Sequence, residues 1–478
     1  MNALKIKNGA CVALDSIPVL PYSEFCDSIV AALSDNTWHC MQYFAQPLPE
    51  SHRRLFVCLA DDTTGDIHLM SSLVACDDKL QPLGDRLPCM QPFERAMNHP
   101  DCPFEESTKA GTQAEHLHEV GVGPIHAGII EPGHFRFTCD GEKVLRLDIR
   151  LGYQHRGVEP CMLQQTKLVQ RSVLVESTCG DSAAAYSTAF AMVWEGLCGF
   201  RPSRRQQLER CLATELERIA IHTGDLSAIC GDVAYQLGNA VFGRLRTPII
   251  NFMQEWCGNR LGKGCLRPGC SPYPFTPALA DRLLQILDRY ERDFQEMVRK
   301  ANSLPSVLSR LERTGVLSAG QALECGAVGM AARASGLARD IRSSHPYYVY
   351  RELQHQCITR DTGDVYARFK IRRHDIEQSL GYVRQLAGWL KAEPAAAAPC
   401  ASLLPQANSF CLAATEGWRG EVCHCAISDA QGQLALYKIV DPSLHNWTCL
   451  ALAVAGNEIS DFPICNKSFN LSYCGNDL

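Results

Sequence analysis

The chain has 478 residues, of which 46% are hydrophobic and 21% are charged, a balance typical of globular proteins with a large core. Its formal net charge of -6 argues against a nucleic-acid-binding protein, because such proteins carry basic surfaces. No stretch of about 18 uninterrupted apolar residues occurs, so we expect no transmembrane segment. The 25 cysteines accompany no recognisable export signal, and we interpret most of them as small buried side chains rather than disulfides.

The N-terminal hundred residues alternate short β-like runs with polar turns. Residues 53–62 (RRLFVCLADD) and 65–74 (GDIHLMSSLV) predict two adjacent strands joined by a tight turn. The segment from about residue 101 to residue 120 is polar and lacks a hydrophobic period, which predicts a linker. We therefore expect a small α/β domain that precedes a separate, larger one.

The larger part of the chain mixes hairpin and helix patterns. Residues 134–153 predict a β-hairpin that turns at Asp140-Gly141. Apolar residues at offsets of three and four then predict long helices, and the C-terminal part returns to strands. The expected helices cover residues 209–230, 277–301, 374–392 and a segment near 305–328. Residues 392–399 (AEPAAAAP) predict an exposed loop. Two strands are expected at residues 420–429 and 433–440, around a turn at Gln431-Gly432.

A set of motifs occurs in a fixed order along the chain. They are GPIHAGIIEPGHFRF (123–137), RLGYQHRGVE (150–159), ESTCGDSAAAYSTAFAMVWE (176–195), ELERIAIHTGDL (215–226) and, at the end, DFPICNKSFNLSYCGNDL (461–478). As a set they resemble the large subunit that group 4 membrane-bound [NiFe] hydrogenases share with the 49-kDa subunit of complex I. The N-terminal part, ending in PFERAMNHP, is similar to the 30-kDa subunit of complex I, which is fused to the large subunit in formate-hydrogenlyase-like proteins.

The resemblance implies an α+β fold in three parts. Residues 1–105 would form a complex I 30-kDa-like α/β domain, residues 106–120 a linker, and residues 121–478 a hydrogenase-type large-subunit domain. The large domain would have a central helical bundle with flanking β-hairpins. The C-terminal tail would run buried into the core beside residues 176–186, with Asn470 and Ser472 directed at the position of the family's metal and hydrogen-bonded to Cys179 or Arg419.

The family holds nickel and iron with four thiolates from two CxxC pairs, because soft sulfur ligands suit these metals. The first pair aligns with Cys179 and Ser182, and the usual nearby histidine aligns with Tyr186. The second pair aligns with Ser472 and Gly475, so no thiolate stands in register there. The resemblance therefore implies the energy-converting hydrogenase-related type, which lacks nickel ligands, and we expect no metal in this chain.

Two other cysteine sets were weighed as metal sites. Cys179, Cys465 and Cys474 could supply three thiolates to zinc or iron, although their spacing argues against it. Cys257, Cys265 and Cys270 lie in a Gly/Pro-rich loop whose spacing matches no zinc or cluster pattern. We favour free thiols for this loop.

Complex I uses the same region to bind quinone. The family's quinone-facing histidine corresponds to His134, which could donate a hydrogen bond or proton to a quinone carbonyl. The partner tyrosine aligns with Gly180, which has no side chain to donate, so quinone reduction is weakened but stays open. The candidate cavity-lining residues are His126, Gly180, Ser182, Tyr186, Asn470 and Ser472.

Several charged residues carry two interpretations. Glu176 matches a proton-relaying glutamate but could pair with an arginine, and Arg419 matches an arginine near the iron ligands but could bind an anion or keep a structural contact. With His134 and Cys179, these two complete the candidate catalytic set. Arg150, His155, Arg156 and Glu159 would line a proton path or form a buried network, and Glu215, Arg218, His222 and Asp225 would form a proton route or a helix–helix ion-pair seam.

The resemblance implies a redox subunit of a membrane-associated, complex I-like oxidoreductase that couples electron transfer to ion translocation. A [4Fe-4S] cluster would sit in a partner small subunit like the 20-kDa subunit of complex I, antiporter-like subunits would form the membrane arm, and a quinone is one acceptor. The chain itself would bind no cofactor and would lie on the cytoplasmic side of the inner membrane. The alternatives are a non-redox coupling subunit and an active nickel hydrogenase.

Overall fold

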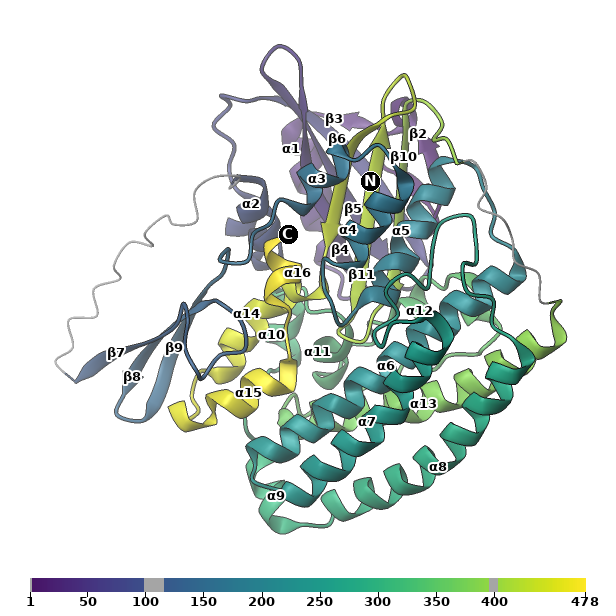
Figure 1. Cartoon of the computed structure of the whole chain (residues 1–478). Coiled ribbons are helices and arrows are strands. Elements are labelled where there is room, and N and C mark those ends of the chain that lie inside the picture. The colour runs from purple at the N-terminus through teal and green to yellow at the C-terminus, as the bar shows by residue number, and fades with distance from the viewer. Residues whose placement is uncertain (1, 99–115, 395–402) are drawn as a thin grey trace.

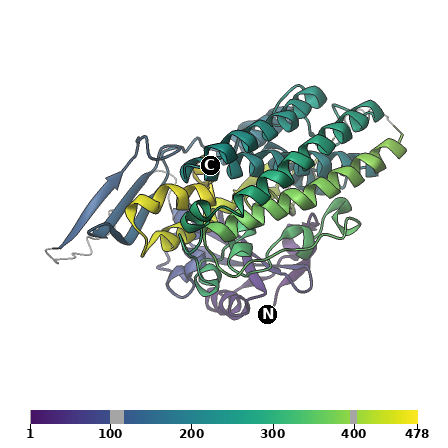
Figure 2. The same ribbon diagram turned by 90° about the horizontal axis from the view of Figure 1, so that it is seen from below.

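The computed structural model describes residues 2–98, 116–394 and 403–478. The N-terminal sheet and a C-terminal sheet lie at one end, and long helices lie at the other, as Figure 1 shows. A small third sheet stands out from the side of the body in both views (Figures 1 and 2). The mixture of helix and sheet agrees with the expected α+β class.

The N-terminal sheet confirms the two predicted strands. They are antiparallel neighbours, with Leu55 opposite Ser72, and they turn at Gly65, which has a φ of 65°. The sheet contains β1 (Leu4–Ile6), β3 (Val19–Leu20), β4 (Trp38–Leu48), β5 (His52–Asp61) and β6 (Asp66–Ala75), and it is accompanied by α1 (Tyr22–Leu33), α2 (Gln91–Asn98) and the 3-10 turns η1 (Leu14–Ser16), η2 (Leu83–Asp85) and η3 (Pro88–Met90).

The C-terminal sheet takes one strand from the start of the chain. It has the order β12 (Leu434–Val440), β11 (Glu421–Ser428), β10 (Ser409–Glu416) and β2 (Cys11–Ala13). Cys11 lies opposite Cys411, so the N-terminal segment pairs directly with the large domain. The expected domain boundary at residue 105 lies outside the described residues and stays a prediction, but one continuous hydrophobic core joins the two parts.

The helical part confirms most of the predicted helices. It contains α3 (Val158–Gln164), α4 (Leu168–Glu176), α5 (Ala183–Leu197), α6 (Arg204–Asp232), α7 (Gln236–Cys257), α8 (Pro277–Ala301), α9 (Pro305–Leu311), α10 (Ala319–Glu324), α11 (Gly329–Ala334), α12 (Ile341–Ser344), η4 (Tyr348–Arg351) and α13 (Val365–Ala392). The predicted helix near 305–328 is wrong, because this stretch is broken at Gly315 and Gly326, whose φ angles are positive. Helix α13 begins nine residues before the predicted start, capped by Asp364, whose side chain accepts from Ala367 N.

The third sheet corrects the predicted linker. Residues 117–120, assigned to that linker, belong to β7 (Leu117–Val122), which pairs with the predicted hairpin of β8 (His134–Asp140) and β9 (Lys143–Arg150). The C-terminal elements α14 (Pro442–Val454), η5 (Ile459–Asp461), α15 (Phe462–Phe469) and α16 (Tyr473–Asp477) lie between this sheet and the long helices (Figures 1 and 2). Phe135 and Phe137 of β8 both pack on Phe462, which anchors the sheet to the tail.

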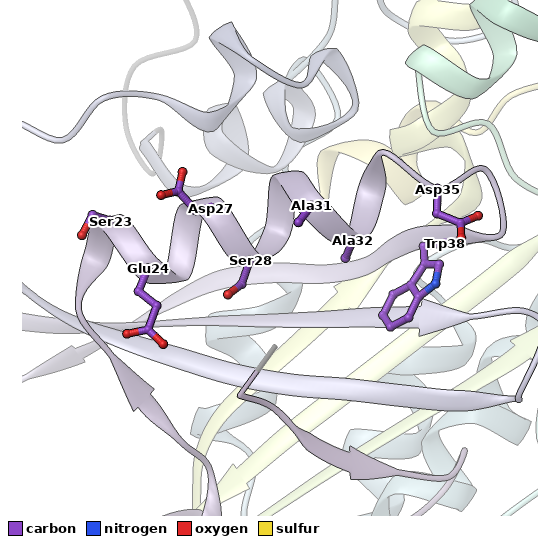
Figure 3. A pocket seen from close by; sticks show the side chains of 8 residues that line it. All are labelled: Ser23, Glu24, Asp27, Ser28, Ala31, Ala32, Asp35 and Trp38. Carbon is purple, nitrogen blue, oxygen red and sulfur yellow. The ribbon is translucent and has the colours of Figure 1, made fainter.

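Two further observations concern the surface. A hollow of about 660 Å³ runs along α1 and is lined by acidic residues that include Glu24, Asp27 and Asp35 (Figure 3). None of the candidate site residues lines it. Across residues 2–98, 116–394 and 403–478, no helix has the length and apolar character needed to span a bilayer. The expected loop at 392–399 lies largely outside the described residues.

Candidate functional site

Cys179 lies in the tight turn between α4 and α5. Ser182 N donates to the Cys179 carbonyl at 3.0 Å, which closes the turn, and the Cys179 side chain is 2% exposed. The first turn of α5 is capped from another helix, because Glu217 of α6 accepts from the backbone N–H groups of Ala184 and Ala185 at 2.7 and 3.2 Å. The turn is therefore fixed on both sides by buried hydrogen bonds.

The Cys179 thiol is surrounded by polar groups of the chain itself. Its Sγ lies 3.1 Å from Asp181 Oδ1 and 3.2 Å from Ser472 Oγ, and Arg419 Nη1 donates to it at 3.3 Å. Ser472 Oγ also lies 3.5 Å from Cys474 Sγ, and the two thiols are in hydrogen-bonding contact. This contact, followed by burial, raises the pKa of Cys179, whereas donation from Cys179 lowers the pKa of Cys474 to about 7.

Arg419 joins the turn to the C-terminal tail. Its guanidinium binds both carboxylate oxygens of Asp181, at 2.7 and 2.9 Å, and its Nε donates to the carbonyl of Asn470 at 2.6 Å. The Trp418 ring lies 3.8 Å from the guanidinium carbon. Burial would raise the pKa of Asp181, but the charge and hydrogen bonds of Arg419 hold it below its usual value.

The C-terminal tail runs through the core beside the Cys179 turn, as the resemblance implies. Ser472 is 4% exposed, and its Oγ caps α16 by accepting from Gly475 N at 2.9 Å. Gly475 is required by close packing, because a Cβ there would lie 2.5 Å from Asp441 Oδ2. The predicted contacts of Asn470 with Arg419 and of Ser472 with Cys179 are both present.

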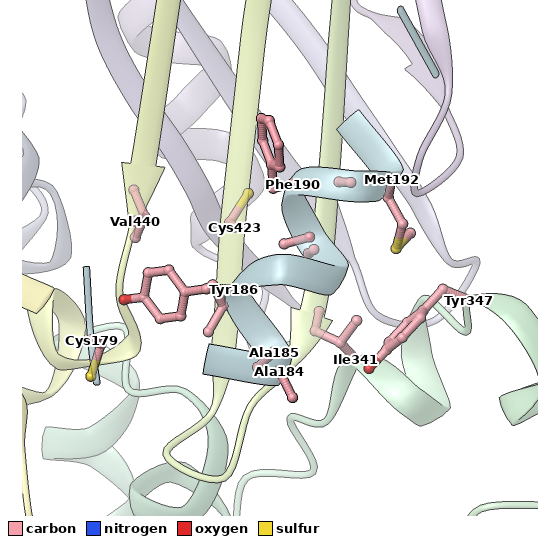
Figure 4. Close-up of a cluster of buried hydrophobic side chains, with 14 of the residues drawn as sticks. Cys179, Ala184, Ala185, Tyr186, Phe190, Met192, Ile341, Tyr347, Cys423 and Val440 are labelled. Carbon is pink, nitrogen blue, oxygen red and sulfur yellow. The ribbon is translucent and has the colours of Figure 1, made fainter. Parts of the chain in front are cut away.

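Tyr186, the counterpart of the family histidine, points across β11 toward the end of β12, where Val440 lies (Figure 4). Its hydroxyl donates a short hydrogen bond to Asp441, the residue that follows β12. The space beside Gly180 is open, because a Cβ added there would meet nothing within 4 Å. The Cys179 turn is thus closed on the Tyr186 side and open beside Gly180, while Ser182 Oγ lies 3.4 Å from Arg419 Nη1.

The loop from residue 123 to 133 reaches the site through a residue that sequence reasoning did not select. Glu131 accepts from the backbone of Cys474, and burial raises its pKa. His134 lies at the start of β8, opposite Arg150 in the ladder, and burial followed by the charges of Arg136 and Arg150 lowers its pKa. His126 is exposed and accepts from Gly128 N through Nδ1 at 2.9 Å. Among the described residues, no hydrogen bond joins either histidine to Cys179.

Glu176 forms the ion pair that was one of its two interpretations. Its carboxylate binds Arg267 through both oxygens, at 2.8 and 3.2 Å, and accepts from Gly264 N at 2.8 Å. Both partners belong to the loop that carries Cys265 and Cys270. Glu176 therefore ties the end of α4 to this loop.

The charged residues between positions 150 and 159 bind different partners. Arg156 donates to the carbonyls of Ser177 and Thr178 at 2.9 and 2.7 Å, and His155 Nδ1 lies 2.8 Å from the Asp477 carbonyl. Glu159 accepts from Ile439 N at 3.0 Å and pairs with Lys438. These contacts hold the tail and β12 in place.

The polar face of α6 forms an ion-pair seam with α13. Asp225 Oδ2 accepts from Arg372 Nε at 2.8 Å, and His222 Nε2 lies 3.3 Å from Asp375 Oδ2. Glu215 binds Arg218, Arg342, Tyr350 and Ser379, and Arg218 donates to the carbonyls of Glu416 and Gly417. Burial would raise the pKa of Asp225, but Arg372 and His222 lower it to about 2.

The seam reaches the Cys179 site through one residue, Asn470. Asn470 Nδ2 donates to Asp225 Oδ1 at 2.7 Å, while the Asn470 carbonyl accepts from Arg419. Asp225 thus connects Arg372 on α13 with Arg419 beside Cys179. The result is one buried, hydrogen-bonded series from the thiols into the helix pair.

The alternative metal sets are not assembled. Cys465 packs near Gly315 and Arg368, away from the Cys179 contacts. Cys257 and Cys265 are in mutual hydrogen-bonding contact. Within the described ranges 2–98, 116–394 and 403–478, no three or more His, Cys, Asp or Glu side chains are grouped to hold a metal ion.

Sequence reasoning missed several residues of the site. Asp181 stands two residues from Cys179 in the same motif and could have been selected as the partner of Arg419. Arg368, Arg372, Asp375 and Ser379 recur at three- and four-residue offsets and mirror the polar face of α6. Asp441 and Glu217 carry no such signal, because only the fold brings them to Tyr186 and to the start of α5.

Comparison with known proteins shows what the chain is similar to. Residues 238–412 match the family described as "Respiratory-chain NADH dehydrogenase, 49 Kd subunit". This match covers less than half of the chain, which is also similar to NADH-quinone oxidoreductase D subunits and to membrane-bound hydrogenase subunits.

Individual relatives are similar to most of the chain. The chain is 29% identical to the carbon monoxide-induced hydrogenase of Rhodospirillum rubrum over 73% of its own length and 96% of that protein. It is 25% identical to hydrogenase-4 component G of Escherichia coli over 90% of its own length and 70% of that protein. The fold matches a chain in the membrane-bound sulfane sulfur reductase, an archaeal respiratory membrane complex, with a TM-score of 0.70 and 20% identity, covering 77% of this chain and 100% of that one.

Proposed function

We propose that this chain is the redox subunit of a membrane-associated oxidoreductase complex that couples electron transfer to ion translocation, and that it works without a nickel–iron centre. The similarity to hydrogenases and to NADH-quinone oxidoreductase D subunits supports the redox class. The observation that carries the coupling is the bridge of Asn470 between Arg419 and Asp225. It joins the position where relatives place their metal or quinone to a buried seam of charges.

A nickel–iron centre does not fit the side chains present. Of the four positions where the family carries thiolates, only Cys179 bears sulfur, and Ser472 Oγ is already hydrogen-bonded to it. The ion pair between Arg419 and Asp181 occupies the space beside the thiol. Four soft ligands are therefore replaced by two hydroxyls, a glycine and one thiol.

Electrons are proposed to arrive from a [4Fe-4S] cluster in a small-subunit partner like the 20-kDa subunit of complex I. Large apolar side chains stand exposed on the loop of residues 123–133 and on α4: Ile125 is 88% exposed and Ile130 is 52% exposed, and Val169 and Val173 on α4 are 54% and 47% exposed. Exposed apolar patches of this kind mark protein interfaces. Antiporter-like membrane subunits are proposed to bind the complex and place this chain peripherally on the cytoplasmic face of the inner membrane.

Two candidate functions follow from different observations. The open space beside Gly180 and the half-buried His134 favour a quinone that approaches from the loop side. The closed contacts of Arg419 with Asp181 favour a second candidate function, in which the chain transmits conformational change without redox chemistry. Redox turnover requires the quinone and His134 in the first case and neither of them in the second.

The first experiment is the analysis of nickel, iron and bound quinone in one preparation of the complex purified from its native membrane. Iron without nickel, together with copurified quinone, supports a quinone-linked redox subunit. Cluster iron with neither nickel nor quinone supports a different acceptor or the non-redox role. Nickel near one atom per complex overturns the proposal.

A second experiment separates coupling from assembly. Asp225→Asn removes the charge that joins Asn470 to Arg372, and Arg244→Gln removes an exposed pairing with Asp293 as the matched control. In vesicles containing the complex, with reduced methyl viologen as donor and decylubiquinone as acceptor, Asp225→Asn is expected to lower ion uptake per electron, with Arg244→Gln unchanged. Equal coupling in both variants contradicts a role for the seam.

A further inference from the structure

The C-terminal tail places a second thiol against Cys179. Cys474 lies on α16, and its Sγ shares the Ser472 hydroxyl with Cys179 Sγ, at 3.5 and 3.2 Å. The two thiols also contact each other directly. Among the motif positions of the family, Cys474 is one residue out of register, so the resemblance assigns it no role.

The two thiols differ in access. Cys474 is partly exposed, whereas Cys179 is buried and lies next to Gly180, where a Cβ would meet nothing within 4 Å. A solvent-borne reactant therefore reaches Cys474 first, and Cys179 stands behind it. This arrangement of an accessible attacking thiol and a buried resolving thiol is suited to disulfide exchange.

The surrounding groups support the charge that such chemistry develops. Arg419 Nη1 donates to Cys179 Sγ at 3.3 Å, and the Ser472 hydroxyl can donate to either sulfur. The pKa of Cys179 is raised by its contact with Cys474 and by burial, and the charge of Arg419 partly opposes this rise. Helix α16 is a five-residue element at the end of the chain, so a small shift of it can bring the sulfurs from contact to the bonding distance of about 2 Å.

We propose that Cys179 and Cys474 form a dithiol/disulfide centre that exchanges with low-molecular-mass disulfides. The Cys474 thiolate attacks one sulfur of a disulfide R–S–S–R, forms a mixed disulfide and releases R–S⁻. The Cys179 thiolate then attacks Cys474 Sγ and releases the second R–S⁻. The two thiol protons pass to the two R–S⁻ groups, so one disulfide is reduced to two R–SH while the protein gains one S–S bond.

This centre stands independently of the proposed function, because it concerns only thiols within the chain. Its consequence is local: oxidation would tie the tail covalently to the turn between α4 and α5. The sulfur of Cys179 would then lose the proton that it shares with Asp181 and Ser472. The centre therefore stores two electrons and two protons at the start of the polar series.

The test uses the full chain in its native complex, equilibrated anaerobically with graded ratios of glutathione and glutathione disulfide. After acid quenching and alkylation, peptide mapping by mass spectrometry assigns the disulfides. The expected result is a Cys179–Cys474 cross-link that appears in a single transition. A second buried pair in thiol contact, Cys325 and Cys449, serves as the internal comparison and is expected to stay reduced because it is less accessible.

Variants define the order of attack. Cys179→Ser is expected to lose the cross-link and to accumulate glutathione on Cys474, whereas Cys474→Ser leaves Cys179 reduced. Cys76→Ser, which removes an exposed thiol elsewhere, leaves the cross-link intact. The inference is overturned if wild-type Cys179 and Cys474 are both alkylated at every ratio, or if Cys474 pairs with another cysteine.

Discussion

Asn470 donates its side-chain amide to Asp225 across the junction of the C-terminal tail and α6, at 2.7 Å. Its backbone adopts a left-handed conformation, with a φ of 50°, where it ends α15. Asparagine tolerates this conformation better than other residues with a Cβ. One residue therefore ends a helix, turns the tail toward Cys179 and links the site to the ion-pair seam.

Substitutions of Asn470 separate these roles. Asn470→Gly keeps the left-handed turn but leaves Asp225 without this donor, at a cost of about 1–3 kcal/mol for a hydrogen bond to a charged group. Asn470→Ala adds about 1 kcal/mol of backbone strain. Asn470→Asp sets two carboxylates together and is expected to be the most destabilising. Thermal midpoints of the purified chain should fall in that order; equal midpoints for Gly and Ala would remove the backbone argument.

Arg419 is expected to protect Cys179 as well as to stabilise the tail. Arg419→Ala leaves Asp181 unpaired, which we expect to cost about 1–3 kcal/mol, less than a fully buried pair because Asp181 is 35% exposed. Arg419→Lys keeps a charge but cannot bind both oxygens of Asp181 and the Asn470 carbonyl together. Both variants should speed alkylation of Cys179 relative to wild type. Arg244→Ala is the matched surface control, and an unchanged alkylation rate in Arg419→Ala would contradict this role.

The sequence predicts the periodicity of a helix better than it predicts which residues pack against the polar face of that helix. The pattern of α6 predicts an apolar face and a polar face, but not that the polar face is buried. That outcome depends on Arg372 and Asp375, which lie about 150 residues later and arrive only through the fold. Both interpretations of the polar residues were therefore open until α13 was placed.

The same limit applies to backbone breaks. The segment near 305–328 has helical spacing, yet the structure breaks it, and Gly329 follows with a φ of 58°. A Cβ on Gly329 would lie 2.1 Å from Gly420 Cα, so the chain there is shaped by the turn between β10 and β11, about ninety residues away. The family resemblance, by contrast, anticipated the buried tail and the contacts of Asn470 and Ser472, because these depend on an architecture rather than on local pattern.

Protonated His39 contributes to folding stability, and this contribution is lost at alkaline pH. Burial alone would lower its pKa, but Asp62 and Glu421, at 3.3 and 2.8 Å, raise it to about 9. Because the folded pKa exceeds the unfolded value of about 6.5, this contribution is fully present below pH 6.5 and is lost as the pH rises through 9. It amounts to about 3 kcal/mol. Urea unfolding should show a steeper loss between pH 6.5 and 9.5 in wild type than in His39→Gln; parallel curves would refute it.

Glu217 also makes the free energy of unfolding fall as the pH rises, but over a lower pH range. Burial raises its pKa to about 8, although the N–H groups of Ala184 and Ala185 partly oppose this. The folded state thus keeps a proton that the unfolded state releases near pH 4.5. The contribution of this protonated carboxyl to folding stability is therefore complete below pH 4.5 and is lost as the pH rises through 8. The stability of wild type relative to Glu217→Gln should decline over this range, by about 4 kcal/mol or less. Glu296→Gln, at an exposed site, should show no comparable decline.

Glu176 and Arg267 are expected to act as one unit. Their double hydrogen bond holds the loop of residues 258–270 against the end of α4. Glu176→Gln leaves the Arg267 guanidinium without its charge partner, and Arg267→Gln leaves the carboxylate with only Gly264 N as a donor. Each single variant is expected to lose about 2–4 kcal/mol, since removing one member of a largely buried pair leaves the other uncompensated.

The double variant decides between the two interpretations of Glu176. If the pair is structural, Glu176→Gln with Arg267→Gln costs little more than either single change, and the coupling energy from the cycle is about 1–3 kcal/mol. Turnover of the assembled complex should then fall equally in both single variants. If Glu176 relays protons, its substitution lowers turnover far more than that of Arg267 while their thermal midpoints match. Measuring both quantities on the same four proteins assigns Glu176 to the loop or to the proton path.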